Sequence, residues 1–96
     1  MANTNDVTFE IVEHIGVIDV IDNREEKWTK EVNVVAWNGG KPKIDVRDWN
    51  EKHDRMSRGI TLTEDQAMKM TKALMDRFRA RAAQEHSTPM KDDYDR

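Results

Sequence analysis

The fold is decided by the stretch WNGGKPKIDVRDW, which runs from Trp37 to Trp49. Its NGG sequence is typical of a tight turn between two antiparallel strands, because asparagine and glycine adopt positive φ at low cost. Pro42 has no backbone N–H and is therefore expected in a loop or at a strand edge. The residues KIDVRDW then alternate between apolar and polar side chains, which is the period of a β-strand. The stretch therefore predicts a β-hairpin.

The alternation after the turn divides the second strand of this hairpin into two rows of side chains. Ile44 and Val46 form the row that we expect to face the core. The opposite row, which we expect to point outward, holds Lys43, Asp45, Arg47 and Trp49. Asp45 weakens this row as a surface for a polyanion, and we expect it to pair with one of the neighbouring cations, Lys43 or Arg47.

Two more strands are expected before the turn and a short one after it. WTKEVNVVAW, residues 28–37, places Val32, Val34 and Ala36 on the expected core face and Asn33, Val35 and Trp37 on the other. TFEIVEHIGVIDVI, residues 8–21, alternates imperfectly, and its Gly16 is expected to mark a bend or bulge. Residues 50–59 are expected to form a polar loop, followed by ITL at 60–62 as a fourth strand.

A helix is expected after these strands. Thr63 and Gln66 form a capping box, with Thr63 as the N-cap, so the helix should run from about Glu64 to about Ala83. Its apolar stripe holds Ala67, Met70, Thr71, Leu74 and Phe78. The expected fold class is α+β, an antiparallel sheet followed by one long C-terminal helix. One domain should span residues 7–83, between a flexible N-terminus at 1–6 and a disordered polar tail at 84–96.

The composition restricts the classes of protein to which the chain can belong. The chain has 96 residues, of which 36% are hydrophobic, and a mean hydropathy of −0.92, so a monomer would be marginally stable and self-association is expected. The lack of cysteine excludes disulfides and thiolate metal sites. No apolar run reaches the roughly 20 residues that span a bilayer, and no signal-peptide pattern is present. A cytoplasmic or nucleoid-associated protein without membrane contact is therefore expected.

The charge is unevenly distributed along the chain. The net charge is −3, which argues against a globally basic nucleic-acid binder. Residues 1–22 hold five acidic residues and no Lys or Arg, whereas residues 23–60 hold nine basic against seven acidic residues. That second segment also contains all three tryptophans. A local basic patch can bind a polyanion even when the whole chain is acidic.

Catalytic and metal-binding patterns are not found in the sequence. His14, His53 and His86 do not have the spacing of metal ligands. No serine lies in a nucleophile motif, and no glycine-rich loop of the phosphate-binding type follows a strand. We therefore expect neither enzymatic activity nor a metal or other cofactor.

The outward row combines flat rings with cations, which is typical of surfaces that bind single-stranded nucleic acid. Unpaired bases stack on exposed rings, and Lys or Arg contacts the phosphates. Trp37 belongs to the non-core face of its own strand, so it can join Lys43 and Arg47 on one surface. The other interpretation is structural, because tryptophans at strand ends often fill the edge of a core.

The segments WNGGKPKIDVRDW and MSRGITLTEDQ together resemble the transcriptional positive-cofactor-4 family, specifically its small bacterial members. The earlier segments FEIVEHIGVI and WTKEVNVVAWN also fit, so the resemblance covers about residues 8–80. It implies a curved four-stranded antiparallel sheet followed by one long helix. It also implies a homodimer with the helices at the interface and sheets that carry single-stranded DNA.

The resemblance implies a set of binding residues. The matching positions are Trp37, Lys43, Arg47 and Trp49, with Trp28 and Lys30 flanking the groove and Asn33, Asn38 and Lys41 as further members. The dimer interface would contain Met70, Leu74 and Phe78 from the helix. The chain differs from eukaryotic members because no basic or serine-rich extension precedes the sheet. A coactivator role that depends on such an extension is therefore not implied.

These observations support one main hypothesis and two alternatives. The main hypothesis is a homodimer that binds single-stranded DNA, or RNA in its place, with little sequence preference, in transcription regulation or in DNA repair and replication. The first alternative is a protein-interaction module that uses the same aromatic and basic face, because aromatic residues and Arg also mark protein hot spots. The second is a small enzyme, which would need a convergent acid–base pair that the sequence does not show.

Overall fold

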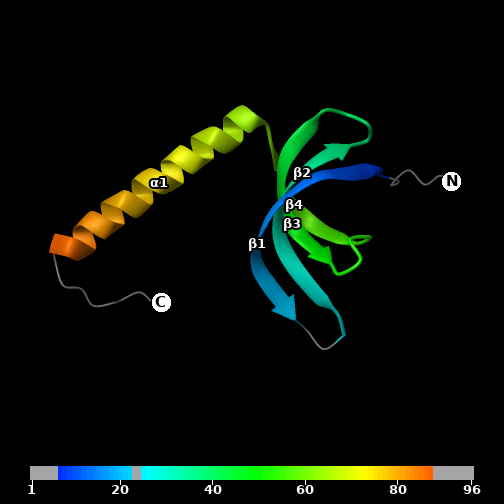
Figure 1. Cartoon of the computed structure of the whole chain (residues 1–96), viewed down its shortest axis with the longest axis horizontal. Coiled ribbons are helices and arrows are strands. Elements are labelled where there is room, and N and C mark those ends of the chain that lie inside the picture. Colours follow the sequence, from blue (N-terminus) through cyan, green and yellow to red (C-terminus); the bar gives the residue numbers. More distant parts are fainter. Residues whose placement is uncertain (1–6, 23–24, 88–96) are drawn as a thin grey trace. The chain divides into compact units, whose positions relative to one another are not determined.

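The computed structural model describes residues 7–22 and 25–87, with side chains as far as residue 84 (Figure 1). The elements are β1 (Phe9–Asp22), β2 (Lys27–Trp37), β3 (Pro42–Asn50), β4 (Met56–Leu62) and α1 (Glu64–Ser87). The strands form one antiparallel sheet in the order β1-β2-β3-β4. The predicted architecture of four antiparallel strands and a C-terminal helix is therefore confirmed.

Two element boundaries differ by four residues from the sequence-based expectation, and the other boundaries differ by at most one residue. β4 begins at Met56 rather than at Ile60, because residues of the expected loop pair with β3, including Met56 with Trp49 and Gly59 with Arg47. The helix ends at Ser87, four residues after the expected end at Ala83. The expected flexible segment at 1–6, and the part of the expected tail at 88–96, lie outside the described residues.

The turn between β2 and β3 has the conformation that its sequence predicts. Asn38 and Gly39 have φ values of 52° and 73°, and the backbone N–H of Gly40 donates to the carbonyl of Trp37 at 2.8 Å. Thr8 ties the turn to the start of β1. Its carbonyl accepts from the Asn38 N–H at 2.7 Å, and its own N–H donates to Asn38 Oδ1 at 3.0 Å. Asn38 therefore shapes the turn and fixes the first strand beside it.

β1 departs from regular pairing at three places. Its register with β2 shifts between Ile11 and Glu13, between His14 and Gly16, and between Val17 and Asp19. The bend or bulge expected at Gly16 is therefore confirmed and is one of three. Each extra residue in one strand of a pair bends that strand and increases its twist. The irregularities thus favour a curled sheet.

The curl of the sheet is strong enough to bring opposite strand ends together. Phe9 pairs with Trp37 at one end of β2, and Trp49 pairs with Thr29 near the other end. Eight residues of extended strand separate these pairs, or about 26 Å if β2 were straight. The Phe9 ring nevertheless lies 5.9 Å from the Trp37 ring and 5.1 Å from the Trp49 ring. One face of the sheet is therefore folded in on itself around these rings.

The enclosed face is the one that the sequence predicted to be outward. Val35 and Trp49 are fully buried, together with Asn33 and Asp45. The row predicted to be the core is half-buried within this chain: Val32, Val34, Ala36, Ile44 and Val46. The expectation that Trp49 points outward is wrong. The alternation identified which residues share a face, but the curl determines which face is covered.

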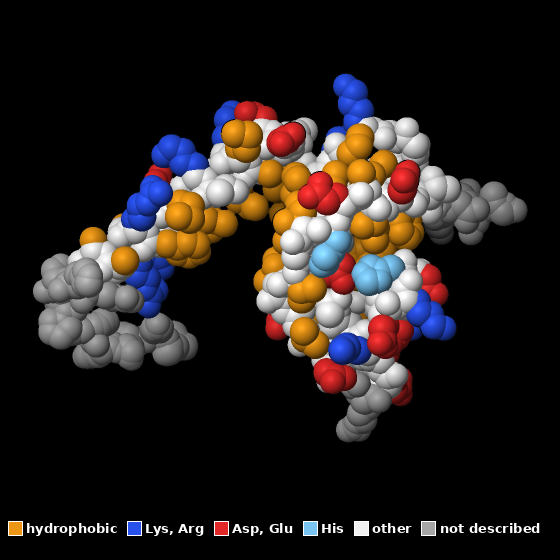
Figure 2. All heavy atoms as spheres, in the orientation of Figure 1, with side chains coloured by type: hydrophobic (Ala, Val, Ile, Leu, Met, Phe, Trp, Pro, Cys, Tyr) orange, Lys and Arg blue, Asp and Glu red, His pale blue; other side chains and the backbone are white. Residues whose placement is uncertain are grey.

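Large apolar side chains remain exposed on β1 and along α1. On β1 they include Ile15, Val17, Ile18 and Val20, each at least half exposed. On α1 they are Met68, Met70, Leu74, Met75 and Phe78, and Figure 2 shows hydrophobic side chains gathered along this helix. In the described part of the chain, no helix combines the length and apolar character needed to cross a bilayer.

Candidate nucleic-acid interface

An open pocket of about 820 Å³ lies where the two ends of the curled sheet approach each other. Its walls combine aromatic rings, two guanidinium groups and a few polar and apolar side chains: Val7, Phe9, Trp28, Trp37, Arg47, Asp54, Arg55, Met56 and Thr61. Three of the residues predicted to bind nucleic acid, Trp28, Trp37 and Arg47, are thus brought together. This volume is in the range of sites that bind small ligands, and the pocket is open to solvent.

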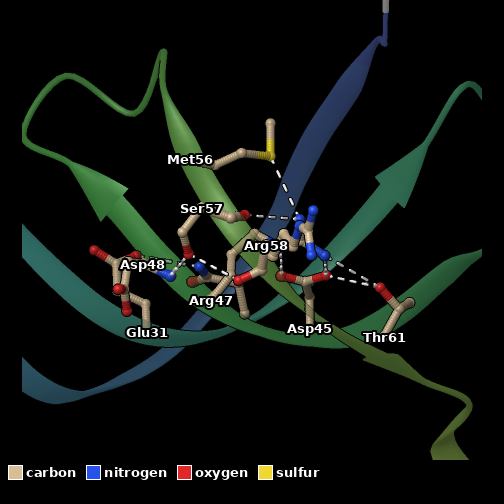
Figure 3. Close-up of polar contacts among 9 residues, drawn as sticks. Glu31, Asp45, Arg47, Asp48, Met56, Ser57, Arg58 and Thr61 are labelled. Atoms are coloured by element: carbon tan, nitrogen blue, oxygen red, sulfur yellow. Dashed lines mark hydrogen bonds and ion pairs between the residues drawn. The ribbon is translucent and has the colours of Figure 1, made fainter.

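Arg47 and Trp37 form the first cation–π pair of the pocket. The guanidinium carbon of Arg47 lies 4.6 Å from the centre of the Trp37 ring system, which is within the range of a cation–π contact. Asp45 holds the other side of this arrangement by a bidentate ion pair. Arg47 Nε donates to Asp45 Oδ1 at 2.6 Å and Nη2 donates to Oδ2 at 2.8 Å (Figure 3). The expected pairing of Asp45 with a cation of its own strand is therefore confirmed for Arg47.

The strand β4 completes the environment of Arg47. Its Nη1 group donates to the carbonyl of Ser57 at 3.3 Å and lies 3.6 Å from the sulfur of Met56. The hydroxyl of Thr61 donates to Asp45 Oδ2 at 2.9 Å, and Arg47 Nη2 contacts that hydroxyl at 3.4 Å. Figure 3 shows these groups converging on Arg47 from two neighbouring strands.

Arg55 and Trp28 form a second, longer cation–π pair. The guanidinium carbon of Arg55 lies 5.9 Å from the Trp28 ring, and its Nη2 group donates to Glu26 Oε1. The Arg55 side chain is 65% exposed, so its charge is accessible to solvent. The pocket therefore has one cation that is enclosed, Arg47, and one that is exposed, Arg55.

The predicted lysines take different positions. Lys41 and Lys43 are exposed, and both lie just after the turn that follows Trp37. Lys30 is 41% exposed and donates to Asp48 Oδ1 at 2.8 Å. In the register of β2 with β3, Lys30 and Asp48 belong to the face opposite that of Arg47. Lys30 is not among the residues that line the pocket.

Trp49 has a structural position. Its ring packs against Phe9 at 5.1 Å and against His53 at 5.5 Å, and it is fully buried. Its indole nitrogen, like that of Trp37, is buried without a hydrogen-bond acceptor among the described residues. A ring in this position cannot stack on a base unless the core opens. Asn33 is also buried, and it hydrogen-bonds within the sheet rather than at the pocket.

A polar cluster surrounds Glu31 beside a second, smaller pocket of about 320 Å³. Thr29 Oγ1 and Asn33 Nδ2 donate to its carboxylate at 2.5 and 3.1 Å, and His53 Nε2 lies 2.9 Å from it. His14 Nδ1 lies 2.7 Å from Asn33 Oδ1 and 3.7 Å from Glu31. Burial raises the pKa of Glu31, but the hydrogen bonds from Thr29, Asn33 and His53 and the charge of His53 outweigh burial and hold the pKa below its ordinary value.

Metal binding at this cluster is not supported by the geometry. Across residues 7–22 and 25–87, no group of three His, Asp or Glu side chains is arranged to hold a metal ion. The hydrogen bonds of Glu31 satisfy its carboxylate within the protein. We therefore assign the cluster a structural role around the buried side chains of Glu31 and Asn33.

Several residues of the pocket were not predicted from the sequence. Phe9 was expected as a strand residue, and Arg55 and Met56 were placed in a polar loop. Thr61 was placed in a short strand without a role. Thr61 is the register partner of Asp45, but the strand period applies within one strand and does not give the register between β3 and β4. No sequence signal indicated the approach of Phe9 to Trp49, because that contact depends on the curl of the sheet.

Comparison with known proteins relates this arrangement to an established family. The model of the family described as Transcriptional Coactivator p15 (PC4) matches residues 24–73, just over half of the chain. The match includes β2, β3 and β4 and thus Trp28, Trp37, Arg47 and Arg55. An uncharacterized protein of Treponema pallidum (strain Nichols) is 30% identical over 59 residues, which cover 62% of this chain and 66% of that relative.

Proposed function

We propose that this chain, which belongs to the transcriptional coactivator p15 (PC4) family, binds single-stranded DNA with little sequence preference. The observation that carries the proposal is the pocket in which Trp28 and Trp37 lie beside the guanidinium groups of Arg47 and Arg55. Indole rings stack on unpaired bases of any identity, at about 1–3 kcal/mol per base. Duplex DNA hides its base faces, so a pocket of this kind favours a single strand.

Phosphate contacts are assigned to the exposed cations around the pocket. Arg55 lies on its wall, and Lys41 and Lys43 follow the turn next to Trp37. Lysine and arginine side chains in solvent can reorient towards a passing phosphate and release its counterions. We assign Asn38 a supporting role, because its side chain already accepts a hydrogen bond from Thr8.

The proposed functional unit is a homodimer. Met70, Leu74 and Phe78 recur along α1 at helical spacing and are 38%, 45% and 56% exposed. An apolar stripe of this kind is costly in water and is typical of a surface that another chain covers. A dimer formed through α1 would contain two sheets, and therefore two binding sites that one DNA strand could occupy together.

The proposed role in the cell follows from the family, which is described as a transcriptional coactivator. Binding to a transiently opened strand suits transcription regulation, and the same activity would serve DNA repair or replication. RNA presents the same base faces and phosphates, so it is a competing ligand. Competition between RNA and DNA oligonucleotides of one sequence would rank the two.

Titration with oligothymidylate, followed by tryptophan fluorescence, tests the proposal directly. We expect quenching at low salt, an affinity that falls as salt rises, and poor competition by duplex of the same length. Trp37→Ala should weaken binding by about tenfold, because one stacking contact is lost. Glu51→Ala, an exposed change in the β3–β4 loop, serves as the matched control and should bind as the unchanged protein does.

Two results would contradict the proposal. One is the absence of quenching at low salt together with folded protein. The other is unchanged binding in the double variant Trp28→Ala/Trp37→Ala. A partner protein that is retained after nuclease treatment, with little dependence on salt, would instead favour a protein-interaction module.

A further inference from the structure

Arg47 is the cation closest to the centre of the aromatic pocket, but protein atoms occupy its hydrogen-bonding groups. Nε and Nη2 donate to Asp45, Nη1 donates to the carbonyl of Ser57, and Nη2 also contacts Thr61 (Figure 3). The Arg47 side chain is 13% exposed, and that of Asp45 is fully buried. The N–H groups that a phosphate would need are therefore already engaged.

A phosphate that binds the Nε and Nη2 fork of Arg47 would have to replace Asp45. Arginine recognises phosphates and carboxylates through the same planar fork, so the two ligands compete for one set of donors. Displacement would leave the Asp45 carboxylate buried without its partner, which is strongly unfavourable. The charge of Arg47 is also balanced by Asp45 at 2.6 Å, so the pair attracts a phosphate weakly.

The guanidinium group also contacts an aromatic ring. Its carbon lies over the Trp37 ring at 4.6 Å, while Asp45 and β4 accept hydrogen bonds from its N–H groups. Trp37 itself has no hydrogen-bond acceptor for its buried indole nitrogen among the described residues. The orientation of this ring is therefore set by packing against Arg47 and Phe9.

Gly59 provides the space that this arrangement needs. It is the register partner of Arg47 on β4. A Cβ atom at Gly59 would lie 2.2 Å from the carbonyl oxygen of Val46 and 2.4 Å from Cβ of Arg47. The close approach of β4 is what brings Ser57 and Thr61 to the guanidinium group. The strand pairing is thus built around Arg47 as a fixed part of the sheet.

We infer that Arg47 is a positioning residue rather than a phosphate ligand. Together with Asp45 it holds the Trp37 ring at the pocket, where the ring stacks on a base. Exposed cations such as Lys43 contact the phosphates. This inference rests on the proposed function. It places the bases of the bound strand beside Trp37 and its phosphates beside the exposed cations at the rim of the pocket.

The salt dependence of binding separates the two roles. Arg47→Lys keeps the charge but loses the planar fork, so we expect about tenfold weaker binding to oligothymidylate with an unchanged slope of affinity against salt. Lys43→Gln is the matched control. It should make the slope of log affinity against log salt concentration less steep by about 0.7, the value for one phosphate contact on a single strand. A reduced slope in Arg47→Gln, with Arg47→Lys binding as the unchanged protein does, would overturn the inference.

The state of Trp37 in the DNA-free protein provides an independent readout. In protein labelled with 5-fluorotryptophan, the Trp37 ¹⁹F resonance can be assigned with Trp37→Phe. We expect it to move and narrow in Arg47→Lys, as the ring becomes mobile, and to stay in place in Lys43→Gln. The double variant Asp45→Asn/Arg47→Gln leaves no unpaired buried charge, so it tests the same point if Arg47→Lys does not fold. A Trp37 resonance that is unmoved in these Arg47 variants would contradict the inference, even if the unchanged protein did not bind DNA and the proposed function had failed.

Discussion

At the scale of single residues, Trp49 carries the largest fully buried side chain among the described residues. Replacement by alanine would leave a cavity between Phe9 and His53. We expect Trp49→Ala to lower the free energy of unfolding by about 3–5 kcal/mol, measured by urea denaturation. Trp49→Phe keeps an aromatic ring and removes an indole N–H that has no acceptor among the described residues, so its loss should be clearly smaller. Equal, small losses in both variants would show that the ring is not a core element.

Glu31 makes the stability of the sheet depend on pH. Its pKa in the folded state is below the ordinary value of 4.5, so its contribution to stability is present above that value and is lost as pH falls through the lower, folded-state pKa. Glu31→Gln should therefore reduce the loss of stability on acidification, measured by urea unfolding between about pH 6 and pH 3. His14 and His53 face the same carboxylate and remain in the variant.

The matched control for the acid dependence is Glu51→Gln. Glu51 is exposed in the β3–β4 loop, and its replacement should leave the acid dependence of the unchanged protein intact. An identical acid dependence in Glu31→Gln and Glu51→Gln would show that Glu31 is not the group responsible.

At the scale of elements, the pairing of β3 with β4 depends on the lack of a side chain at Gly59. A Cβ atom there would meet a backbone carbonyl, which cannot move without breaking the ladder. We expect Gly59→Ala to lower the free energy of unfolding by about 1–3 kcal/mol. Gly16→Ala is the control, because a Cβ at Gly16 meets no atom within 4 Å. A neutral result for Gly59→Ala would mean that β4 can shift at little cost.

The local sequence predicted the strands and the helix well, but it did not predict which face of the sheet is buried. The NGG turn and the alternation around Val46 depend on neighbouring residues, so both are visible in the sequence. The curl that covers Trp49 and Asp45 arises from contacts between residues 40 positions apart, such as Phe9 with Trp49. A period of two cannot indicate such contacts, because it is the same for both faces of a strand. The pairing of Asp45 with Arg47 was predictable because both lie on one strand, two residues apart.

At the scale of the whole molecule, the exposed stripe of α1 predicts self-association. Leu74→Glu places a charge in that stripe, so we expect a halved mass in sedimentation equilibrium and weaker binding to long single strands. Lys69→Glu is the control, because Lys69 is 78% exposed and pairs with Asp65 on the helix surface. A mass of one chain for the unchanged protein would contradict the proposed dimer without affecting the pocket.

The order of the strands also bears on how the protein is made. In the sheet β1-β2-β3-β4 every strand pairs with its neighbour in sequence, so no strand has to enter between two that are already joined. The sheet can therefore grow one hairpin at a time as the chain leaves the ribosome, and such local pairing favours fast folding. The rings of Phe9 and Trp49 can meet only after the third strand has emerged. Closure of the sheet is thus expected only after the third strand has been made, and a nascent chain stopped before Trp49 should remain open to proteases.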